Sequence, residues 1–353
     1  MSKNHPQNIT ILGAGIMGLS CAYTLSKAFP KTNITIIDPA GFPPENASYM
    51  AGGMLAPYCE CDHLPPAYIP AGLESIKFWH EFSKQTGNTF EFAQEGSLIV
   101  AHNEDRHMLE RIKTVLPAEN RGTNVDLAQT EPLLTGKFKD ALLIEGEGHL
   151  HPRKAMDALG KALNKMGASF ADKKAQNLNP DLTIDCRGLF AQDDDPELRG
   201  VKGEILIVRN PDFTLKRPLR LMHPRYPLYI IPREDNIFMI GATIIESADD
   251  FVSLRSGLEL MSALYSLHPT FAHAQMIEMK AGVRPAYPDN LPRITREGDI
   301  IRANGLFRHG FLLAPAMAAC VRDLIAGTKN DMSALFIKDQ KDEDYPQRRR
   351  KTA

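Results

Sequence analysis

The chain has 353 residues, with 41 lysines and arginines against 43 aspartates and glutamates, which gives a formal net charge of −2. Hydrophobic residues make up 43% of it, enough to form the cores of two domains of ordinary size or of one large domain. This composition excludes a collagen-like, a wholly disordered or a coiled-coil protein. The balanced charge argues against a nucleic-acid-binding protein, because such proteins need a basic surface to displace counterions from phosphates.

The cysteines and the apolar segments indicate a cytoplasmic protein that does not associate with membranes. The five cysteines are odd in number and too sparse for a disulfide scaffold, which suits a reducing compartment. Cys59 and Cys61 lack the spacing and the second cysteine pair of a common zinc site, so we expect no metal. The N-terminus carries no apolar signal segment. The longest apolar stretch, Gly310 to Val321, is shorter than the roughly 20 residues that cross a bilayer.

The first fifty residues carry the pattern of a dinucleotide-binding unit. A β-branched run, Asn8 to Leu12, leads into Gly13-Ala-Gly15-Ile-Met-Gly18, and an apolar helical pattern follows. A second strand, Asn33 to Ile37, ends in Asp38. This order of strand, glycine turn, helix, strand and acidic residue is the context that a dinucleotide fingerprint requires.

Each residue of this fingerprint has a physical task. Gly13 permits the tight turn, Gly15 lets the backbone approach a pyrophosphate, and Gly18 lets the helix pack on the strand. The phosphates would meet the helix N-terminus, where free N–H groups favour negative charge. Asp38 is placed to accept hydrogen bonds from a ribose and would repel a 2′-phosphate, which argues against NADP. The motif alone does not separate FAD from NAD.

Helices and strands of a second domain follow. Apolar residues at helical spacing predict a helix over Tyr68 to Lys84 and another after Pro152. Asn88 to Ala101 has the composition of strands. Two domains that share the chain in alternating segments would explain this order.

Alternating apolar residues predict an antiparallel sheet that is separate from the parallel sheet of the dinucleotide unit. They occur in Glu204 to Val208, in the hairpin Leu228 to Gly241, and in Gln275 to Arg284. The fold class is therefore α/β with an α+β second domain, the two being interleaved. The predicted segments are 1–88, 141–198 and 284–330 for the nucleotide-binding domain, 89–140 and 199–283 for the second domain, and 331–353 for a polar, solvated C-terminal tail.

The segment Asn46 to Pro57, which reads Asn-Ala-Ser-Tyr-Met-Ala-Gly-Gly-Met-Leu-Ala-Pro, follows the second strand. Its small residues would let the backbone lie against a flat ring. With the glycine turn, this segment resembles the D-amino-acid-oxidase-like family of FAD oxidoreductases, and within it the glycine oxidases of thiamine biosynthesis. The resemblance runs from about residue 8 to residue 327. It is also carried by Thr183 to Gly188, Leu228 to Gly241, Ala281 to Pro285 and Asn304 to Pro315.

The resemblance implies a Rossmann-like FAD-binding domain, an antiparallel-sheet substrate domain and a set of site residues. Arg284 and Arg308 would bind the carboxylate of a small amino acid, because a planar guanidinium can meet both carboxylate oxygens. Tyr229 would add a hydroxyl donor. The residues expected to contact FAD are Gly13, Gly15, Ile16, Met17, Gly18, Asp38, Ala47, Ser48, Gly52, Gly53, Met54, Gly188, Leu306, Arg308, His309, Gly310, Phe311 and Leu312.

Other roles remain open for these residues. Arg284 could be a structural ion-pair partner, Arg308 could touch the flavin, and Tyr229 could be a packing residue of its hairpin. We expect His149 and His151 to be structural, with His309 as a neighbour of the flavin and no general base.

The last motif also predicts a helix. Pro315 suits the first turn of a helix, where its missing N–H costs nothing, and Ala316 to Ile325 can continue as an apolar helix. The helix N-terminus would direct partial positive charge at the flavin, on the side where negative charge develops on reduction.

The activity implied by the resemblance is oxidative deamination of glycine, sarcosine or other small amino acids. FAD would accept a hydride from Cα at its N5 atom and return the electrons to O2 as peroxide, and the imine would supply thiazole formation. The resemblance also implies a homo-oligomer and a functional link to a thiazole synthase. Two alternatives are a D-amino-acid dehydrogenase of the same fold that reduces a carrier other than O2, and a non-catalytic protein that has kept the fold.

Overall fold

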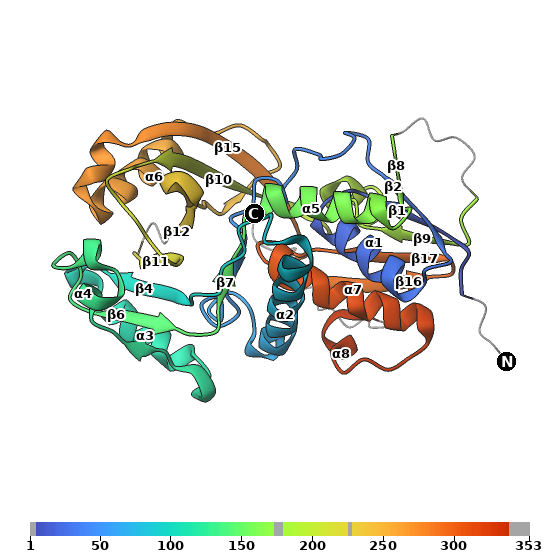
Figure 1. The fold of residues 1–353 in the computed structure, drawn as a ribbon, viewed down its shortest axis with the longest axis horizontal. Coiled ribbons are helices and arrows are strands. Elements are labelled where there is room, and N and C mark those ends of the chain that lie inside the picture. The colour runs from blue at the N-terminus through green and yellow to red at the C-terminus, as the bar shows by residue number, and fades with distance from the viewer. Residues whose placement is uncertain (1–4, 173–178, 225–227, 339–353) are drawn as a thin grey trace, which may run out of the picture.

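Two β-sheets organise the chain, which passes between them several times (Figure 1). The computed structural model describes residues 5–172, 179–224 and 228–338. The six-stranded sheet and its helices occupy the right half of Figure 1, and the nine-stranded sheet occupies the left half. This arrangement confirms the predicted class, a Rossmann-like domain joined to a second, largely antiparallel domain.

The six-stranded sheet is built around the dinucleotide unit. Its central strands are parallel and buried, with Ile9 opposite Ile34 on one side and opposite Leu182 on the other. Such β-branched and apolar strands fit a sheet that is covered on both faces. The strands, in sheet order, are β16 (Arg293–Glu297), β17 (Ile300–Asn304), β9 (Leu182–Asp185), β1 (Asn8–Leu12), β2 (Asn33–Ile37) and β8 (Ser169–Ala171). Only β16 runs antiparallel to its neighbour.

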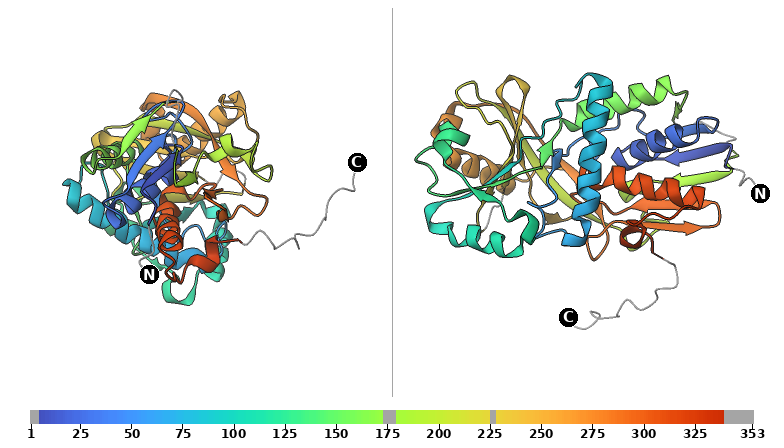
Figure 2. Two further views of the ribbon diagram at one scale, coloured as in Figure 1. Left: turned by 90° about the vertical axis from the view of Figure 1, so that its right-hand side faces the viewer. Right: turned by 60° about the horizontal axis from the view of Figure 1, so that its bottom comes forward.

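Three helices lie side by side across one face of this sheet (Figure 2): α5 (Pro152–Lys165), α1 (Ile16–Ala28) and α7 (Gly310–Ala326). The predicted helix around residues 68–84 is α2 (Ile69–Thr86), which packs against α7. Trp79 and Phe82 of α2 are buried in the core of this domain. A short helix, α8 (Ser333–Phe336), follows near the end of the described chain.

The nine-stranded sheet forms the second domain. In sheet order its strands are β14 (Ile245–Glu246), β10 (Arg199–Arg209), β13 (Ile237–Gly241), β12 (Leu228–Arg233), β11 (Leu219–Met222), β4 (Ser97–Ala101), β6 (Ala141–Ile144) and β5 (Thr123–Asn124), and β15 (Gln275–Ala286) pairs with β10. The predicted hairpin is present as β12 and β13. The sheet is antiparallel except where β11 runs parallel to β4. Helices α3 (His107–Val115), α4 (Leu127–Thr130) and α6 (Leu254–Leu267) flank it, and a two-stranded ladder, β3 (Met54–Leu55) with β7 (Gly148–His149), lies between the domains.

The structure moves three of the predicted segment boundaries. Strand β6 pairs with β4, so the second domain continues through Ile144 and does not end at residue 140. Strand β15 continues to Ala286, so the second domain does not end at residue 283. The predicted tail begins too early, because Phe336 is fully buried and its ring contacts Tyr68. Residues 339–353 of the predicted tail lie outside the described residues.

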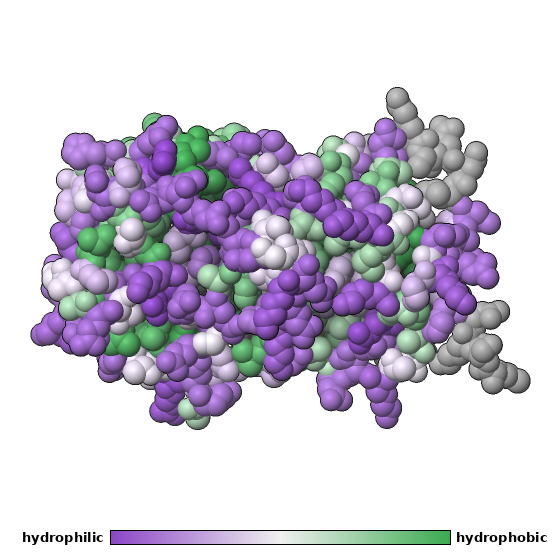
Figure 3. Space-filling model, viewed as in Figure 1, coloured by the Kyte–Doolittle hydropathy of each residue, from purple (hydrophilic) through white to green (hydrophobic). Residues whose placement is uncertain are grey.

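None of the helices in the described ranges combines the length and the apolar character needed to cross a membrane. On the face drawn in Figure 3, hydrophilic residues predominate and hydrophobic residues appear in separate areas. This distribution agrees with the balanced composition of the chain.

Helix α7 begins earlier than its sequence predicts. It starts at Gly310, so Pro315 lies inside the helix and not in its first turn. A proline there removes the N–H that would bond to the carbonyl four residues earlier. Helix α2 compensates for this loss: the Trp79 indole N–H donates to the Phe311 carbonyl at 2.8 Å, and Ser75 Oγ accepts from Ala316 N at 3.3 Å.

A double-mutant cycle tests this compensation. Trp79→Phe leaves the buried Phe311 carbonyl without its donor, and we expect it to lower the free energy of unfolding by about 1–3 kcal/mol through that loss, with a further packing cost. In a Pro315→Ala background the helix regains its own N–H, so the same Trp79 substitution should cost less. Chemical denaturation of the four proteins measures both costs. Equal costs in the two backgrounds would contradict the explanation.

His149 gives the fold a specific sensitivity to acid. It lies in β7, is buried, and its pKa is lowered to about 3 by burial and by Arg233. In the unfolded chain a histidine titrates near pH 6.5. Between pH 6.5 and 3 the unfolded chain therefore binds more protons at this position, and the free energy of unfolding falls as the pH falls.

We expect His149→Gln to reduce the slope of unfolding free energy against pH, between pH 4 and 6, by about 1.4 kcal/mol per pH unit, which corresponds to one proton. Denaturation at several pH values measures this slope. His107, which is exposed on α3, supplies the matched control, and His107→Gln should leave the slope close to that of the unchanged protein. Equal slopes for both variants would exclude His149 as the source.

Candidate active site

A cavity of about 1080 Å³ lies where the two sheets meet. Its walls come from the glycine turn after β1, the loop 44–54, strands β10, β12, β13 and β15, and the segment 304–312 that leads into α7. All residues expected to contact FAD line this cavity except Gly18. A Cβ atom at Gly18 would lie 2.0 Å from the Gly13 carbonyl oxygen, so this glycine lets α1 pack against the turn beneath the cavity.

The glycine turn has the backbone geometry that the sequence requires. Gly13 has φ = +97°, and a Cβ atom there would lie 2.5 Å from the Cys186 carbonyl oxygen. Gly15 forms the N-cap of α1 and has no capping side chain, and Gly15, Ile16 and Met17 all line the cavity. A helix N-terminus of this kind is suited to a phosphate group.

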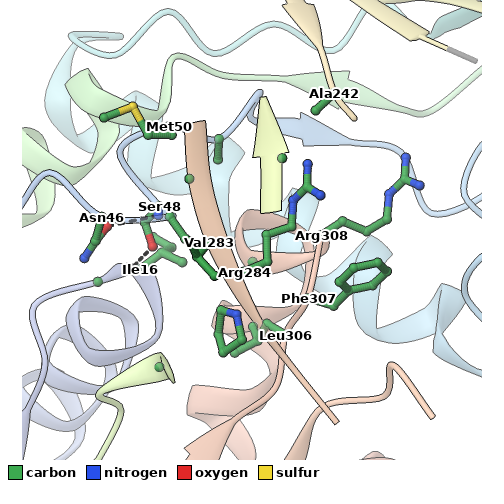
Figure 4. A pocket seen from close by; sticks show the side chains of 18 of the residues that line it. Ile16, Asn46, Ser48, Met50, Ala242, Val283, Arg284, Leu306, Phe307 and Arg308 are labelled. Carbon is green, nitrogen blue, oxygen red and sulfur yellow. Dashed lines mark hydrogen bonds between the residues drawn. The ribbon is translucent and has the colours of Figure 1, made fainter. Parts of the chain in front are cut away.

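Two side chains hold the turn in place. The Asp38 carboxylate accepts a hydrogen bond from Ala14 N at 2.8 Å, and Ser48 Oγ accepts one from Ile16 N at 3.0 Å. Ser48 is itself positioned by Asn46, whose side-chain oxygen accepts from Ser48 N (Figure 4). The loop that follows β2 is thereby fixed against the start of α1, and the lining fits a dinucleotide that extends along it.

Two arginines that the sequence did not single out fasten this loop to the second domain. Arg233 of β12 donates to the carbonyl oxygens of Gly52 and of Leu150, the latter at 2.7 Å. Arg153 of α5 donates to the Tyr49 carbonyl at 3.2 Å and forms an ion pair with Glu278 of β15. Because all of these contacts join distant parts of the chain, no local pattern could have indicated them.

Arg284 extends from β15 into the cavity wall, and Figure 4 shows it projecting in the same direction as Arg308. Its guanidinium lies over Gly203 of β10, where a Cβ atom would come within 2.0 Å of Nη2. It donates to the Thr243 carbonyl at 3.1 Å, and it makes no ion pair among the described residues. Burial, together with the positive charge of Arg308, lowers the pKa of Arg284 below its usual range. An anion bound beside it would relieve this penalty.

Arg308 faces a carboxylate of the chain, which is the principal feature that the sequence did not reveal. Its Nη2 donates to Oε1 of Glu60 at 3.3 Å, and its Nε lies 3.0 Å from Oε2, which has no hydrogen-bond partner among the described residues. The Tyr229 hydroxyl donates to the same Oε1. The three side chains expected to bind a substrate carboxylate therefore share the cavity, but two of them are engaged by Glu60.

Charges around Glu60 keep it ionised. Burial opposes ionisation, but the pKa of Glu60 is lowered to about 2, with Arg308 and Arg220 among the charges that lower it. His309 has a pKa lowered to about 4, chiefly by burial, so its ring is neutral near pH 7. The site thus holds an ionised carboxylate and a neutral imidazole.

A second buried carboxylate fixes the turn that carries Glu60. Oε1 of Glu147 accepts hydrogen bonds from Tyr58 N at 2.7 Å and from Cys59 N at 2.8 Å. Burial raises the pKa of Glu147 to about 7. Arg220 donates to the Cys59 carbonyl and to Asp62 on the other side of the turn. Glu60 is therefore held rigidly towards the cavity.

The earlier start of α7 changes the environment of the cavity. His309 is the N-cap residue, and the first residues of the helix, including Gly310 and Leu312, line the cavity. The positive end of the helix dipole is therefore at the cavity wall, several residues nearer than a helix starting at Pro315 would place it.

A substitution at Gly203 tests whether the position of the Arg284 guanidinium matters for carboxylate binding. Gly203→Ala should displace the guanidinium, and we expect the dissociation constant of a small carboxylate, measured by perturbation of the flavin spectrum, to rise at least tenfold. Gly257→Ala on α6 introduces the same methyl group where the nearest atom is a flexible Met279 side-chain carbon at 3.3 Å. That control should bind the carboxylate as the unchanged protein does. Equal binding by both variants would show that Arg284 does not contact the carboxylate.

Comparisons with known proteins agree with this site. Residues 8–324 match the family model of the FAD-dependent oxidoreductases named DAO, and the chain belongs to this family. It is therefore an FAD-dependent oxidoreductase. It is 41% identical over 313 residues, covering 88% of this chain and 94% of the relative, to a Rhizobium etli protein described as thiamine biosynthesis oxidoreductase ThiO.

Two further relatives extend over nearly the whole chain. The glycine oxidase of Bacillus subtilis is 25% identical over 359 residues, covering 92% of this chain and 94% of the relative. The crystal structure of glycine oxidase from Geobacillus kaustophilus superposes with a TM-score of 0.80 at 23% identity, covering 95% of this chain and 99% of that one. The last comparison bears on the fold alone.

Proposed function

We propose that this enzyme oxidises glycine and other small amino acids or amines such as sarcosine, with O2 as the electron acceptor. The observation that carries the proposal is the arrangement of charges in the cavity: Arg284 has no carboxylate partner among the described residues, whereas Arg308 is paired with Glu60. One free guanidinium suits a substrate with one carboxylate. The similarity to the glycine oxidase of Bacillus subtilis and to ThiO of Rhizobium etli supports this substrate class.

The proposed residue roles follow from the geometry. Arg284 binds the substrate carboxylate and fixes its orientation as well as its charge. FAD, when bound, supplies the acceptor for the hydride that leaves Cα and passes both electrons to O2, which becomes H2O2. A hydride leaves Cα together with its bonding electron pair, so neither His309 nor Glu60 has to remove a proton from Cα. Orientation of the substrate then supplies most of the effect of the protein.

One wall of the cavity is largely apolar. Tyr229, Ile231 and Met239 of the β12–β13 hairpin form a buried cluster with Met50 of the cofactor loop, and all four line the cavity. A charged side chain of a substrate would find no ion-pair partner in this cluster. This arrangement supports glycine and sarcosine over amino acids with charged side chains.

The wider biological role is also a proposal. We propose that the imine product supplies thiazole formation in thiamine biosynthesis, in a functional link to a thiazole synthase, and that the enzyme is a cytoplasmic homo-oligomer. Similarity to a relative described as a thiamine biosynthesis oxidoreductase supports the pathway.

The direct test is to add glycine to the purified flavoprotein without oxygen and then to admit air. We expect the flavin absorbance to bleach, to recover in air, and to yield peroxide. Bleaching with recovery only on addition of an artificial acceptor would favour the dehydrogenase. A flavin that stays oxidised with glycine and sarcosine would contradict the proposed substrate class.

Arg284→Met should raise the half-saturating concentration of glycine about 100-fold, because each hydrogen bond to a charged group contributes about 1.5–3 kcal/mol. Arg199→Met is the matched control, since Arg199 pairs with Glu246 on the surface and lies outside the cavity lining. Steady-state peroxide production measures both variants. An unchanged half-saturating concentration for Arg284→Met would remove Arg284 from the substrate site.

A further inference from the structure

Three arginines line the cavity, and Arg187 is paired with Asp185 and Asp194. Of the other two guanidinium groups, only one is available to a ligand carboxylate. These two groups belong to Arg284 and Arg308. Arg308 already meets a carboxylate through Nε and Nη2, and that carboxylate belongs to Glu60 of the chain. Arg284 makes no such pair among the described residues.

Glu60 occupies Arg308 in the manner of a bound ligand. It lines the cavity, is only 6% exposed, and receives the Tyr229 hydroxyl on Oε1 in addition to the guanidinium. A charged guanidinium N–H and a tyrosine hydroxyl form the kind of donor set that recognises a carboxylate. Glu60 therefore fills a second carboxylate-binding position with a side chain of the protein.

The contacts that hold the turn around Glu60 oppose its departure from Arg308. The turn that carries Glu60 is fixed by the two hydrogen bonds from its backbone to Glu147. A ligand carboxylate could reach Arg308 only if Glu60 moved away and remained as an unpaired buried anion, which is strongly unfavourable. The low pKa of Glu60 indicates that protonation does not release it near neutral pH.

We propose that Glu60 determines the charge selectivity of the site: it masks Arg308 and Tyr229, so that the enzyme accepts monocarboxylates and rejects substrates with a second carboxylate. The proposal rests on the proposed function in one respect, the binding of the substrate carboxylate by Arg284. It predicts that removing the charge of Glu60 creates a second anchor without altering the first.

The test compares pairs of ligands that differ by one carboxylate. Sarcosine and iminodiacetate are both N-substituted glycines, one with a methyl group and the other with a carboxymethyl group. Methoxyacetate and oxydiacetate are the corresponding ethers, which have no amine to oxidise, and their binding can be followed by the flavin spectrum. In the unchanged holoenzyme we expect methoxyacetate to bind more tightly than oxydiacetate, and sarcosine to be turned over in preference to iminodiacetate.

Glu60→Gln keeps the size of the side chain and an acceptor for Tyr229 but removes the charge. We expect this variant to bind oxydiacetate at least tenfold more tightly, relative to methoxyacetate, than the unchanged enzyme does. The kcat/KM for iminodiacetate relative to that for sarcosine should rise as well. Glu60→Asp keeps the charge and should retain the preference for monocarboxylates. Glu246→Gln makes the same exchange at a carboxylate that pairs with Arg199 and lies outside the cavity lining, and it should leave both ratios unchanged.

The outcomes separate this proposal from the proposed function. Failure of glycine to reduce the flavin would contradict the function, whereas the ether ratios report charge selectivity without any oxidation. Unchanged ratios in a folded, flavin-loaded Glu60→Gln variant would overturn the role of Glu60. If that variant does not bind flavin, the unchanged protein still tests the proposal. Tighter binding of oxydiacetate than of methoxyacetate would show that Arg308 is not masked.

Discussion

A guanidinium that is withdrawn from bulk water requires an anion or a set of acceptors, and this requirement organises the site. Arg308 obtains its anion from Glu60, whereas Arg284 has one carbonyl acceptor, that of Thr243, and no ion pair among the described residues. This difference leaves the guanidinium of Arg284 in the cavity wall without an anion. A substrate carboxylate would supply that anion, and the same contact would orient the rest of the substrate.

Much of the surrounding structure serves to keep these charges where they are. The pairing of β10 with β15 places Gly203 beneath Arg284, and the absence of a side chain there makes room for the guanidinium. Glu147 holds the turn that presents Glu60. On the cofactor side, Asp38 and Ser48 hold the glycine turn at the start of α1. The catalytic geometry thus depends on contacts between segments that are distant in sequence.

The sequence was sufficient where the determining interactions are local. The first strand, the glycine turn, α1 and the second strand follow one another directly, and their roles depend on backbone conformations that only glycine permits. The β12–β13 hairpin and helices α2 and α5 were predictable as well, because the spacing of apolar residues that indicates each of them lies within one segment of the chain. The start of α7 was not, because Pro315 is tolerated inside the helix only through Trp79 and Ser75 of α2. The role of β6 was hidden in the same way, since its partner β4 lies some forty residues earlier in the chain.

Glu60 shows this limit most clearly. In the sequence it stands between two cysteines, and nothing local distinguishes it from a surface glutamate. Its partner Arg308 is 248 residues away, and the pair forms only when the first and last segments of the nucleotide-binding domain come together. Sequence reasoning could name Arg284, Arg308 and Tyr229 as neighbours of a carboxylate, but it could not tell that part of this group is already engaged by the protein.

The most direct measurement is a crystal structure of the flavin-loaded enzyme with methoxyacetate, a monocarboxylate that resembles sarcosine and cannot be oxidised as an amine. We expect the ligand carboxylate to lie on the guanidinium of Arg284 and the ion pair between Arg308 and Glu60 to be preserved. A carboxylate bound to Arg308, with Glu60 displaced from it, would contradict the roles proposed for both arginines.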